Sequence, residues 1–294
     1  MALTEDLRVV RGGRIRLARN CWIAENDAED LASRCSAVLE TSADHSLVGS
    51  VTAAQLYGFW LPRLPDEIHV VTATPERRGR SMTRTKRPQF VTHRFQLAEQ
   101  DQTTLKGVPI TTPARTWRDL ASVLELPDLV AAGDSVLRSG VPVEELWAVC
   151  ERTRRAPFAR RATVALGLLD ARSRSRPESH LRVAVSGAGL PRFQVNEPIY
   201  RDEGGWLAEP DLSLPEAKLA LEYQGEEHAD VRRMRKDITR GVDRRADKWL
   251  VYQYGPIEVF RRPWQVRAEV RATIADRAPH LLQGVRRIPR KAAS

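Results

Sequence analysis

A β-hairpin pattern in the second half of the chain places the strongest constraint on what this sequence can fold into. Two apolar runs, 206–214 and 217–224, are separated only by a Pro-Glu turn, and short apolar runs bounded by turn residues are typical of paired strands. Antiparallel pairing would put Asp211 nearly opposite Glu222, with Cβ atoms ~4.5–5.5 Å apart. Like charges at that separation destabilise a sheet, so the pair predicts a bound cation.

Size and hydropathy place the chain among ordinary globular proteins. Its 294 residues are enough for two domains, and 42% of them are hydrophobic. No apolar run approaches the ~18 residues that a membrane span requires, and the N-terminal segment has no apolar signal core. We therefore expect a cytoplasmic protein with no membrane partner.

The cysteine pattern argues against both a disulfide framework and a zinc site. The three cysteines, Cys21, Cys35 and Cys150, are odd in number, and no pair has Cys-x-x-Cys spacing. We expect them to be buried, reduced thiols.

The chain is strongly basic, with a formal net charge of +9. Such a charge is typical of a protein with a polyanionic partner, although a bias toward arginine can also reflect genome composition. Two clusters of basic residues favour nucleic acid as that partner. The candidate nucleic-acid-binding residues are Arg232, Arg235, Lys236, Arg240 and Arg244 on a helix predicted over 227–247, and Arg77 and Arg78 in the loop 75–88. The alternative for the helix is a solvated face with local ion pairs, and the alternative for the loop is an unstructured segment.

Short strand and helix patterns alternate through the first half. Thr112 and Pro113 have the residue types of a helix N-cap and a first helical position. Trp117 and Trp147 lie at apolar positions of predicted helices, so we expect both in the core. The patterns predict a hairpin over 7–25, helices over 27–40, 50–58 and 112–121, strands over 68–72 and 90–95, and further helices to about 172.

A polar, basic linker at 171–177 marks a predicted domain boundary. Beyond it the order is helix, three strands, helix, strand, helix, which predicts an α/β, more specifically α+β, protein. The predicted elements are helices over 177–189, 227–247 and 263–275, and strands over 193–200, 206–214, 217–224 and 249–254. The predicted domains are 1–172 and 173–280, followed by a basic tail at 281–294.

Acidic residues are placed to converge on the hairpin. Glu178 lies in the first turn of the preceding helix, and Gln224 shares a strand face with Glu222. Mg²⁺ (or Mn²⁺) binds oxygen ligands and keeps several waters, so two or three carboxylates suffice. The candidate metal ligands are Glu178, Asp211 and Glu222. The alternative is ordinary strand-and-turn chemistry, with Glu178 only complementing the helix dipole.

These residues carry a resemblance. Asp211 followed by Glu222-x-Gln224, behind the helix bearing Glu178, resembles the PD-(D/E)XK restriction-endonuclease-like superfamily. The extension Gly225-x-x-His228 makes residues 175–276 similar to very-short-patch-repair-type endonuclease domains. The resemblance implies an αβββαβ fold and Mg²⁺-dependent DNA cleavage, with Asp211, Glu222, Gln224 and His228 as catalytic residues. His228 would act as general base or orient the phosphate.

The first half resembles the AbiEi-type antitoxin and regulator family over about residues 8–150. The segments that carry the resemblance are 51–58 (VTAAQLYG), 68–72 (IHVVT) and 107–116 (GVPITTPART). This family implies a winged-helix-like DNA-binding piece, a mixed α/β module and a toxin-like partner. The expected N-terminal helix-turn-helix is short here, since the chain starts almost at the predicted wing.

Two functions follow from these patterns. The first is a Mg²⁺-dependent DNA endonuclease in DNA repair or in defence against foreign DNA. The alternative is a non-catalytic DNA-binding regulator or antitoxin whose degenerate nuclease fold is a scaffold, which is favoured by Gln224 standing where the superfamily has lysine. A third interpretation is RNA binding or processing. The sequence leaves a homodimer open.

Overall fold

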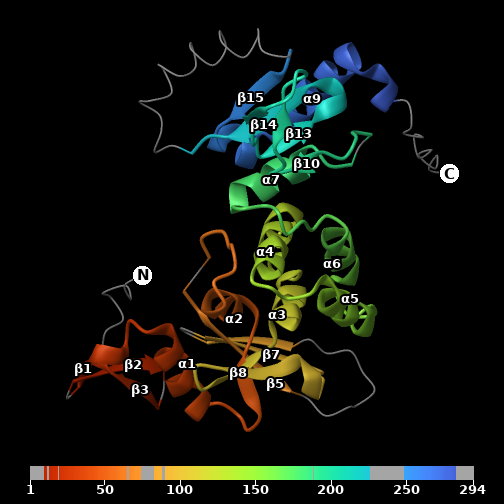
Figure 1. Ribbon diagram of the computed structural model, residues 1–294. Coiled ribbons are helices and arrows are strands. Elements are labelled where there is room, and N and C mark those ends of the chain that lie inside the picture. Colours follow the sequence, from red (N-terminus) through yellow and green to blue (C-terminus); the bar gives the residue numbers. More distant parts are fainter. Residues whose placement is uncertain are drawn as a thin grey trace, which may run out of the picture. The chain divides into compact units, whose positions relative to one another are not determined.

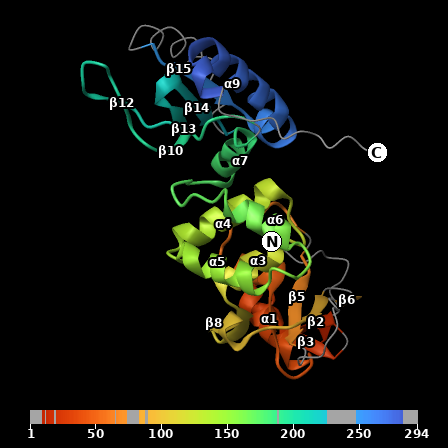
Figure 2. The same cartoon turned by 90° about the vertical axis from the view of Figure 1, so that its right-hand side faces the viewer.

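The chain divides into two compact units, Met1–Leu166 and Gly167–Ser294. Figures 1 and 2 show both units of the computed structural model, coloured along the sequence. Helices and several sheets make up the described residues, in agreement with the predicted α+β class. None of the described helices is long and apolar enough to cross a membrane. The structure describes residues 10–11, 13–18, 20–64, 66–73, 83–87, 90–187, 189–225 and 248–282.

A six-stranded mixed sheet forms the centre of the first unit, in the order β6-β7-β5-β4-β9-β8. The pairs β5–β7 and β4–β9 are parallel, and the other neighbours are antiparallel. The strands are β4 (Ser46–Val48), β5 (Ile68–Ala73), β6 (Thr83–Arg87), β7 (Phe90–Phe95), β8 (Gln102–Leu105) and β9 (Val108–Thr111). A separate three-stranded sheet consists of β1 (Val10–Arg11), β2 (Arg14–Ala18) and β3 (Cys21–Ala24), one strand more than the predicted hairpin.

Helix α3 of the first unit begins where local signals predict it. Thr112 Oγ1 accepts a 3.4 Å hydrogen bond from the Arg115 N–H, and Pro113 is the first helical residue of α3, so the predicted cap is confirmed. The helices α3 to α6 lie together as a group (Figures 1 and 2). The helices are α1 (Leu31–Glu40), α2 (Ser50–Leu56), α3 (Pro113–Leu120), α4 (Leu126–Arg138), α5 (Val143–Arg152) and α6 (Ala159–Leu166).

The two tryptophans expected in the core have different surroundings. Trp117 is fully buried, and its indole N–H donates a 2.9 Å hydrogen bond to the Leu129 carbonyl. Trp147 is 50% exposed, so its predicted core position is wrong. Leu146 and Val149 make up the buried face of α5, and Trp147 lies about 100° around the helix from Leu146. The three cysteines are buried free thiols, as predicted.

The second unit contains a four-stranded mixed sheet in the order β10-β13-β14-β15. Its first three strands are antiparallel neighbours, whereas β14 and β15 run parallel. The strands are β10 (Gln194–Val195), β13 (Leu212–Leu214), β14 (Leu219–Tyr223) and β15 (Leu250–Tyr254). The connection from β14 to β15 passes through 226–247, which lies outside the described residues.

Two predicted strands are each broken into two. The strand expected over 193–200 is interrupted at Asn196, whose φ of 49° is left-handed. The strand expected over 206–214 is interrupted near Pro210, which has no N–H to donate to a ladder. The resulting short strands β11 (Ile199–Tyr200) and β12 (Trp206–Ala208) pair separately as a hairpin.

In the second unit, apolar side chains pack on both faces of the central strand β14. Leu219 and Leu221 on β14 are fully buried in one cluster with residues of α7 (Arg176–Ala184) and α9 (Pro263–Arg277). Ala220, on the opposite face of the same strand, packs with Ile199 and Trp249. Because both faces of β14 are covered, the hairpin is held firmly and its end at Asp211 and Glu222 has a defined position.

Candidate functional site at the edge of the C-terminal sheet

Asp211 and Glu222 face each other at the end of the β13–β14 hairpin. Leu212 pairs with Leu221 in the register, so the next step outward places Asp211 opposite Glu222, as the sequence pattern predicts. The Tyr223 N–H donates a 2.7 Å hydrogen bond to Asp211 Oδ2. The Asn196 N–H donates to the Asp211 carbonyl at 3.0 Å. The backbone and side chain of Asp211 are therefore both fixed.

The electrostatic surroundings of Asp211 are unfavourable to its charge. Burial raises the pKa of Asp211 to about 6, although the hydrogen bond from the Tyr223 N–H opposes the rise. The negative charges of Glu178 and Glu222 raise this pKa further, which means that all three acids lie within electrostatic reach. A carboxylate with this pKa changes charge close to neutral pH, and a nearby cation would stabilise its ionised form.

Glu178 is held in a helix cap. Its Oε1 accepts a hydrogen bond from Ser175 Oγ at 2.8 Å, and Ser175 Oγ in turn accepts one from the Glu178 N–H at 3.4 Å. Ser175 is thus the N-cap of α7, and the Glu178 side chain reaches back to its hydroxyl. Glu178 Oε2 accepts from the Arg174 N–H at 2.8 Å and from Asn196 Nδ2 at 2.9 Å. Both carboxylate oxygens are therefore engaged within the protein.

Glu222 has a partner on the neighbouring parallel strand. Gln253 on β15 lies beside Glu222 in the register, and its Nε2 donates a 3.2 Å hydrogen bond to Glu222 Oε2. Gln253 and Asn196 thus orient the acids from two sides, and neither residue is predicted by the sequence pattern. No local pattern indicates Gln253, since its place beside Glu222 depends on how β15 aligns with β14 after a connection of more than twenty residues.

The acids fit a divalent cation only in part. Asp211 and Glu222 supply the carboxylate oxygens that Mg²⁺ prefers, and Mg²⁺ is often held by one or two carboxylates plus water. Among the described residues, however, no three His, Cys, Asp or Glu side chains are grouped so that they could hold a metal ion. Glu178 already accepts hydrogen bonds on both carboxylate oxygens, and its role as a metal ligand stays a prediction. A metal on Asp211 and Glu222 stays a prediction.

An aromatic cluster borders the same sheet edge. Phe260 belongs to a π-helix, Ile257–Arg261, that follows β15. Its ring centroid lies 4.8 Å from that of His180 and 6.3 Å from that of Tyr223. The Arg176 guanidinium carbon lies 4.8 Å from the same centroid, within cation–π range. The cluster joins α7, β14 and the π-helix beside the acids.

Of the remaining predicted site residues, Gln224 lies in the described part of the chain and the others lie outside it. Gln224 directly follows β14, and its N–H donates a 2.9 Å hydrogen bond to the Tyr254 carbonyl, which keeps it at the same sheet edge. The residues that lie outside the described part of the chain are His228, Arg232, Arg235, Lys236, Arg240, Arg244, Arg77 and Arg78.

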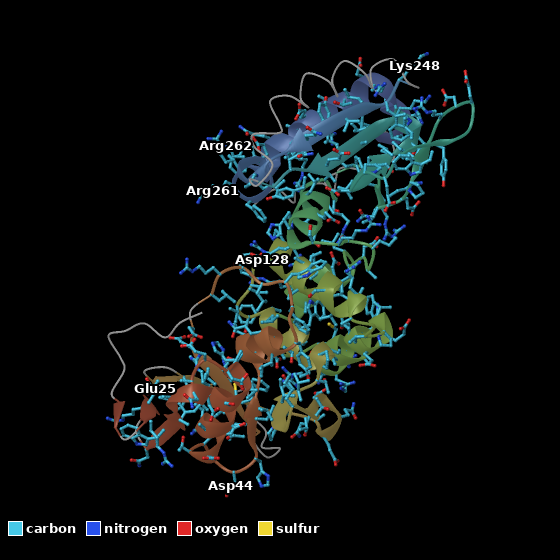
Figure 3. The ribbon with its side chains drawn as sticks, turned by 60° about the vertical axis from the view of Figure 1, so that its left-hand side comes forward. Glu25, Asp44, Asp128, Lys248, Arg261 and Arg262 are labelled. Atoms are coloured by element: carbon cyan, nitrogen blue, oxygen red, sulfur yellow. The ribbon has the colours of Figure 1, made fainter. Side chains whose placement is uncertain are left out.

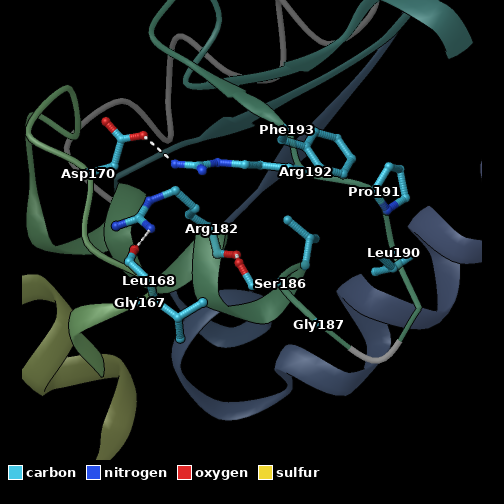
Figure 4. Close-up of a pocket in the computed structure, with 11 residues that line it drawn as sticks. Gly167, Leu168, Asp170, Arg182, Ser186, Gly187, Leu190, Pro191, Arg192 and Phe193 are labelled. Carbon is cyan, nitrogen blue, oxygen red and sulfur yellow. Dashed lines mark hydrogen bonds and ion pairs between the residues drawn. The ribbon is translucent and has the colours of Figure 1, made fainter. Parts of the chain in front are cut away.

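A separate small cavity borders α7. Its volume of about 200 Å³ is below the ~300–1,000 Å³ of most ligand pockets. Figure 4 shows two arginines there: Arg182 donates to the Leu168 carbonyl, and Arg192 forms a 3.7 Å ion pair with Asp170. Arg182 also donates from Nε to Ser173 Oγ at 3.3 Å. Because both guanidinium groups have partners and the space is small, we assign it no ligand.

Comparison with known proteins shows that part of the first unit is similar to a family of antitoxin domains. The matching family is the AbiEi antitoxin C-terminal domain, and the match covers residues 47–170. This range contains the strands β5 to β9 and the helices α2 to α6, together with all of β4 except its first residue. Searches of curated proteins and of solved structures returned no match. The resemblance to very-short-patch-repair endonucleases finds no support in these comparisons.

Proposed function

We propose that this protein is a regulator of the antitoxin class that binds DNA, with a C-terminal unit that is non-catalytic. The observation that carries the proposal is the match of residues 47–170 to the AbiEi antitoxin C-terminal domain. The acids of the C-terminal unit support a non-catalytic role, since Glu178 is committed to a helix cap. Gln224 in place of the motif lysine supports it as well.

Charge supports DNA as the ligand of this regulator. The net charge of +9 would be used in contacts to phosphates, and each such contact releases counterions from the duplex. Binding of this kind weakens steeply as salt rises, while sequence preference comes from contacts to base edges. A toxin-like protein would be the second partner, contacted through the antitoxin-like domain.

The test is binding to duplex DNA. Anisotropy of a labelled duplex from upstream of the protein's own reading frame would be compared with a shuffled duplex between about 50 and about 200 mM salt. The proposal expects a steep loss of affinity with salt and tighter binding to the upstream duplex. Absence of binding to any duplex at the lowest salt would contradict it. Rescue of growth from an inhibitory protein encoded beside it would test the antitoxin role.

A second candidate function, a Mg²⁺-dependent endonuclease, is favoured by the opposition of Asp211 and Glu222. The sheet order, with three antiparallel strands and a fourth parallel one, is compatible with the αβββαβ arrangement that this function requires. Asp211 and Glu222 would hold the ion, and Asn196 and Gln253 would keep Glu178 and Glu222 oriented. A bound divalent cation supplies charge neutralisation and water activation at a phosphodiester.

Plasmid nicking separates the two candidates. Wild type, Asp211→Asn and Glu222→Gln would be incubated with Mg²⁺ or Mn²⁺, and Glu203→Gln in the exposed β11–β12 turn serves as a charge-matched control. Cleavage by wild type and by the control, abolished in both site variants, would support the endonuclease. Intact plasmid together with salt-sensitive DNA binding by wild type would leave the regulator as the function.

A further inference from the structure

We propose that the segment from Ile257 to Trp264, between β15 and α9, is a DNA-contacting surface on the C-terminal unit. In this proposal Arg261 and Arg262 contact backbone phosphates, and the Trp264 ring packs against a backbone sugar. The inference rests on the proposed DNA binding and names the surface that carries it. None of these residues belongs to the basic clusters that the sequence pattern indicates.

The segment lies at the same sheet edge as the acidic pair. Strands β14 and β15 are parallel, so their C-terminal ends are side by side. Glu222 lies near the end of β14, and the π-helix Ile257–Arg261 begins three residues after β15 ends. The contact between the rings of Phe260 and Tyr223 spans this edge. A duplex seated on the arginines would therefore lie beside Asp211 and Glu222.

The backbone of the segment is anchored from within. Val259 is 2% exposed, and Phe260 packs against Arg176 and His180. Glu258, the one acid of the segment, accepts a 3.0 Å hydrogen bond from the Gly255 N–H. A rigid backbone lowers the entropy lost when side chains bind a ligand. π-Helical turns are rare and frequently occur at functional sites.

The side chains on the outside of the segment form an uncompensated basic and aromatic surface. Arg261 and Arg262 are exposed, and Figure 3 labels both where the segment reaches the solvent. Neither forms an ion pair with another described residue. Trp264 is 63% exposed and Ile257 is 55% exposed. Tryptophan is usually well buried, so its exposure beside two arginines indicates an interface.

Phosphate is the ligand that this charge pattern fits best. Adjacent guanidinium groups form strong charge-assisted hydrogen bonds with phosphate oxygens. An aromatic ring next to them packs against the backbone sugar, a contact that carries no sequence information. An acidic protein surface would also meet the arginines, but the net charge of +9 favours the polyanion. Duplex DNA is therefore the proposed occupant, and a protein partner is an outcome that the test can reveal.

The test compares matched double variants of the full chain. Arg261→Gln/Arg262→Gln removes two charges from the proposed surface, whereas Arg192→Gln/Arg201→Gln removes two exposed charges elsewhere in the same unit. Each lost phosphate contact lowers the salt slope by about one. For Arg261→Gln/Arg262→Gln we expect the slope of log affinity against log salt concentration to fall in magnitude by about two and binding to weaken about tenfold or more. The control variant should show much smaller changes in both quantities.

Trp264 gives an independent measurement. Trp264→Ala removes the apolar contact of the ring and should weaken DNA binding by about tenfold, whereas Trp264→Phe keeps a ring and should retain most affinity. The DNA-induced quenching of tryptophan fluorescence should be smaller in Trp264→Phe than in wild type. Thermal melts of every variant establish that the fold is retained, which the exposure of these side chains leads us to expect.

The outcomes distinguish this inference from the proposed function. If wild type binds no duplex at low salt, the proposed DNA binding is wrong, and so is the assignment of this surface. If wild type binds but the two double variants lose affinity and slope equally, the surface assignment alone is overturned. Stronger competition by RNA of equal length than by duplex DNA would overturn the choice of DNA. The choice would also be overturned if Arg261→Gln/Arg262→Gln left DNA binding unchanged but abolished binding of a protein partner.

Discussion

Asp211 lies opposite Glu222 across the β13–β14 hairpin, one residue beyond the pair formed by Leu212 and Leu221. The hairpin is buried on both faces of β14, so the two acids cannot separate without disturbing the core. Opposed like charges destabilise a sheet, and here they are tolerated through hydrogen bonds from the backbone and from Gln253. This edge is therefore a site of stored electrostatic strain that a cation or protonation would relieve.

The first prediction concerns pH. Burial and the neighbouring Glu178 and Glu222 raise the pKa of Asp211 to about 6, whereas an unfolded aspartate has a pKa of about 3.9. Between these values the folded chain keeps a proton that the unfolded chain has released. The stability that Asp211 contributes is thus greatest below about pH 4 and is lost as pH rises through about 6.

Asp211→Asn removes this dependence, because the amide stays neutral and still accepts from the Tyr223 N–H. Relative to wild type, its free energy of unfolding should be about 1–2 kcal/mol higher near pH 7.5 after allowance for screening by solvent, with the difference vanishing near pH 4. Urea denaturation at both pH values measures it. A variant less stable than wild type at the higher pH would contradict the prediction.

Asn196 tests how the acids are held. It has a φ of 49° and donates from Nδ2 to Glu178 Oε2 and to the Arg172 carbonyl at 2.8 Å. Asn196→Ala loses both hydrogen bonds and keeps a Cβ in the left-handed region, so we expect a loss of about 2–3 kcal/mol. Asn196→Gly loses the same bonds without that strain and should be about 1 kcal/mol more stable than the alanine variant. Equal stabilities in thermal denaturation would argue against the left-handed strain.

Removing one member of a buried ion network should strongly destabilise the first unit. Asp101 is 2% exposed and accepts hydrogen bonds from Arg115 at 2.9 Å and Arg152 at 2.6 Å. Arg115 also donates to Asp119 at 3.0 Å. Asp101→Ala leaves a buried guanidinium without one of its carboxylates, so we expect a loss of about 3 kcal/mol or more.

The exposed ion pair between Arg154 and Glu151 is the control for this network. Their side chains are 62% and 69% exposed, and such pairs contribute little. Arg154→Ala should change the free energy of unfolding by less than about 0.5 kcal/mol. Comparable losses for Asp101→Ala and Arg154→Ala in urea denaturation would show that the network is not a major stabilising element.

Gly49 offers a test of packing inside the region that matches the antitoxin family. A Cβ placed on Gly49 would lie 2.4 Å from Val71 Cγ2, well inside contact distance. We expect Gly49→Ala to destabilise the chain by about 1–3 kcal/mol through overpacking. Val71→Ala removes the clashing methyl, so Gly49→Ala/Val71→Ala should lose less than the sum of the single variants. Strict additivity in a double-mutant cycle would refute the clash.

Local signals made several elements predictable. The Thr112–Pro113 start of α3 is encoded within four residues, because the cap and the fixed φ of proline act on the adjacent backbone. The opposition of Asp211 and Glu222 follows from a short turn, since turn length sets hairpin register. Positions that depend on a single side chain's environment were less predictable. Trp117 and Trp147 have similar local patterns, yet Trp117 is fully buried and Trp147 is half exposed.

Pairings between distant segments were not predictable. The parallel pairs β5–β7 and β4–β9 and the strands β6, β8 and β9 did not emerge from sequence periodicity. Gln253 reaches Glu222 only because β15 aligns in parallel with β14 after a long connection. The exposure of Arg261, Arg262 and Trp264 likewise depends on Phe260 being drawn inward by α7 and β14.

The amino-acid sequence by itself determined the hairpin, its opposed acids, the helix caps and the overall positive charge, because each depends on neighbouring residues or on composition. The tertiary structure decided which groups surround those acids and which of the described arginines are exposed. The physical reason is that burial and electrostatic fields act through space. A pKa such as that of Asp211 therefore depends on side chains that only folding brings together.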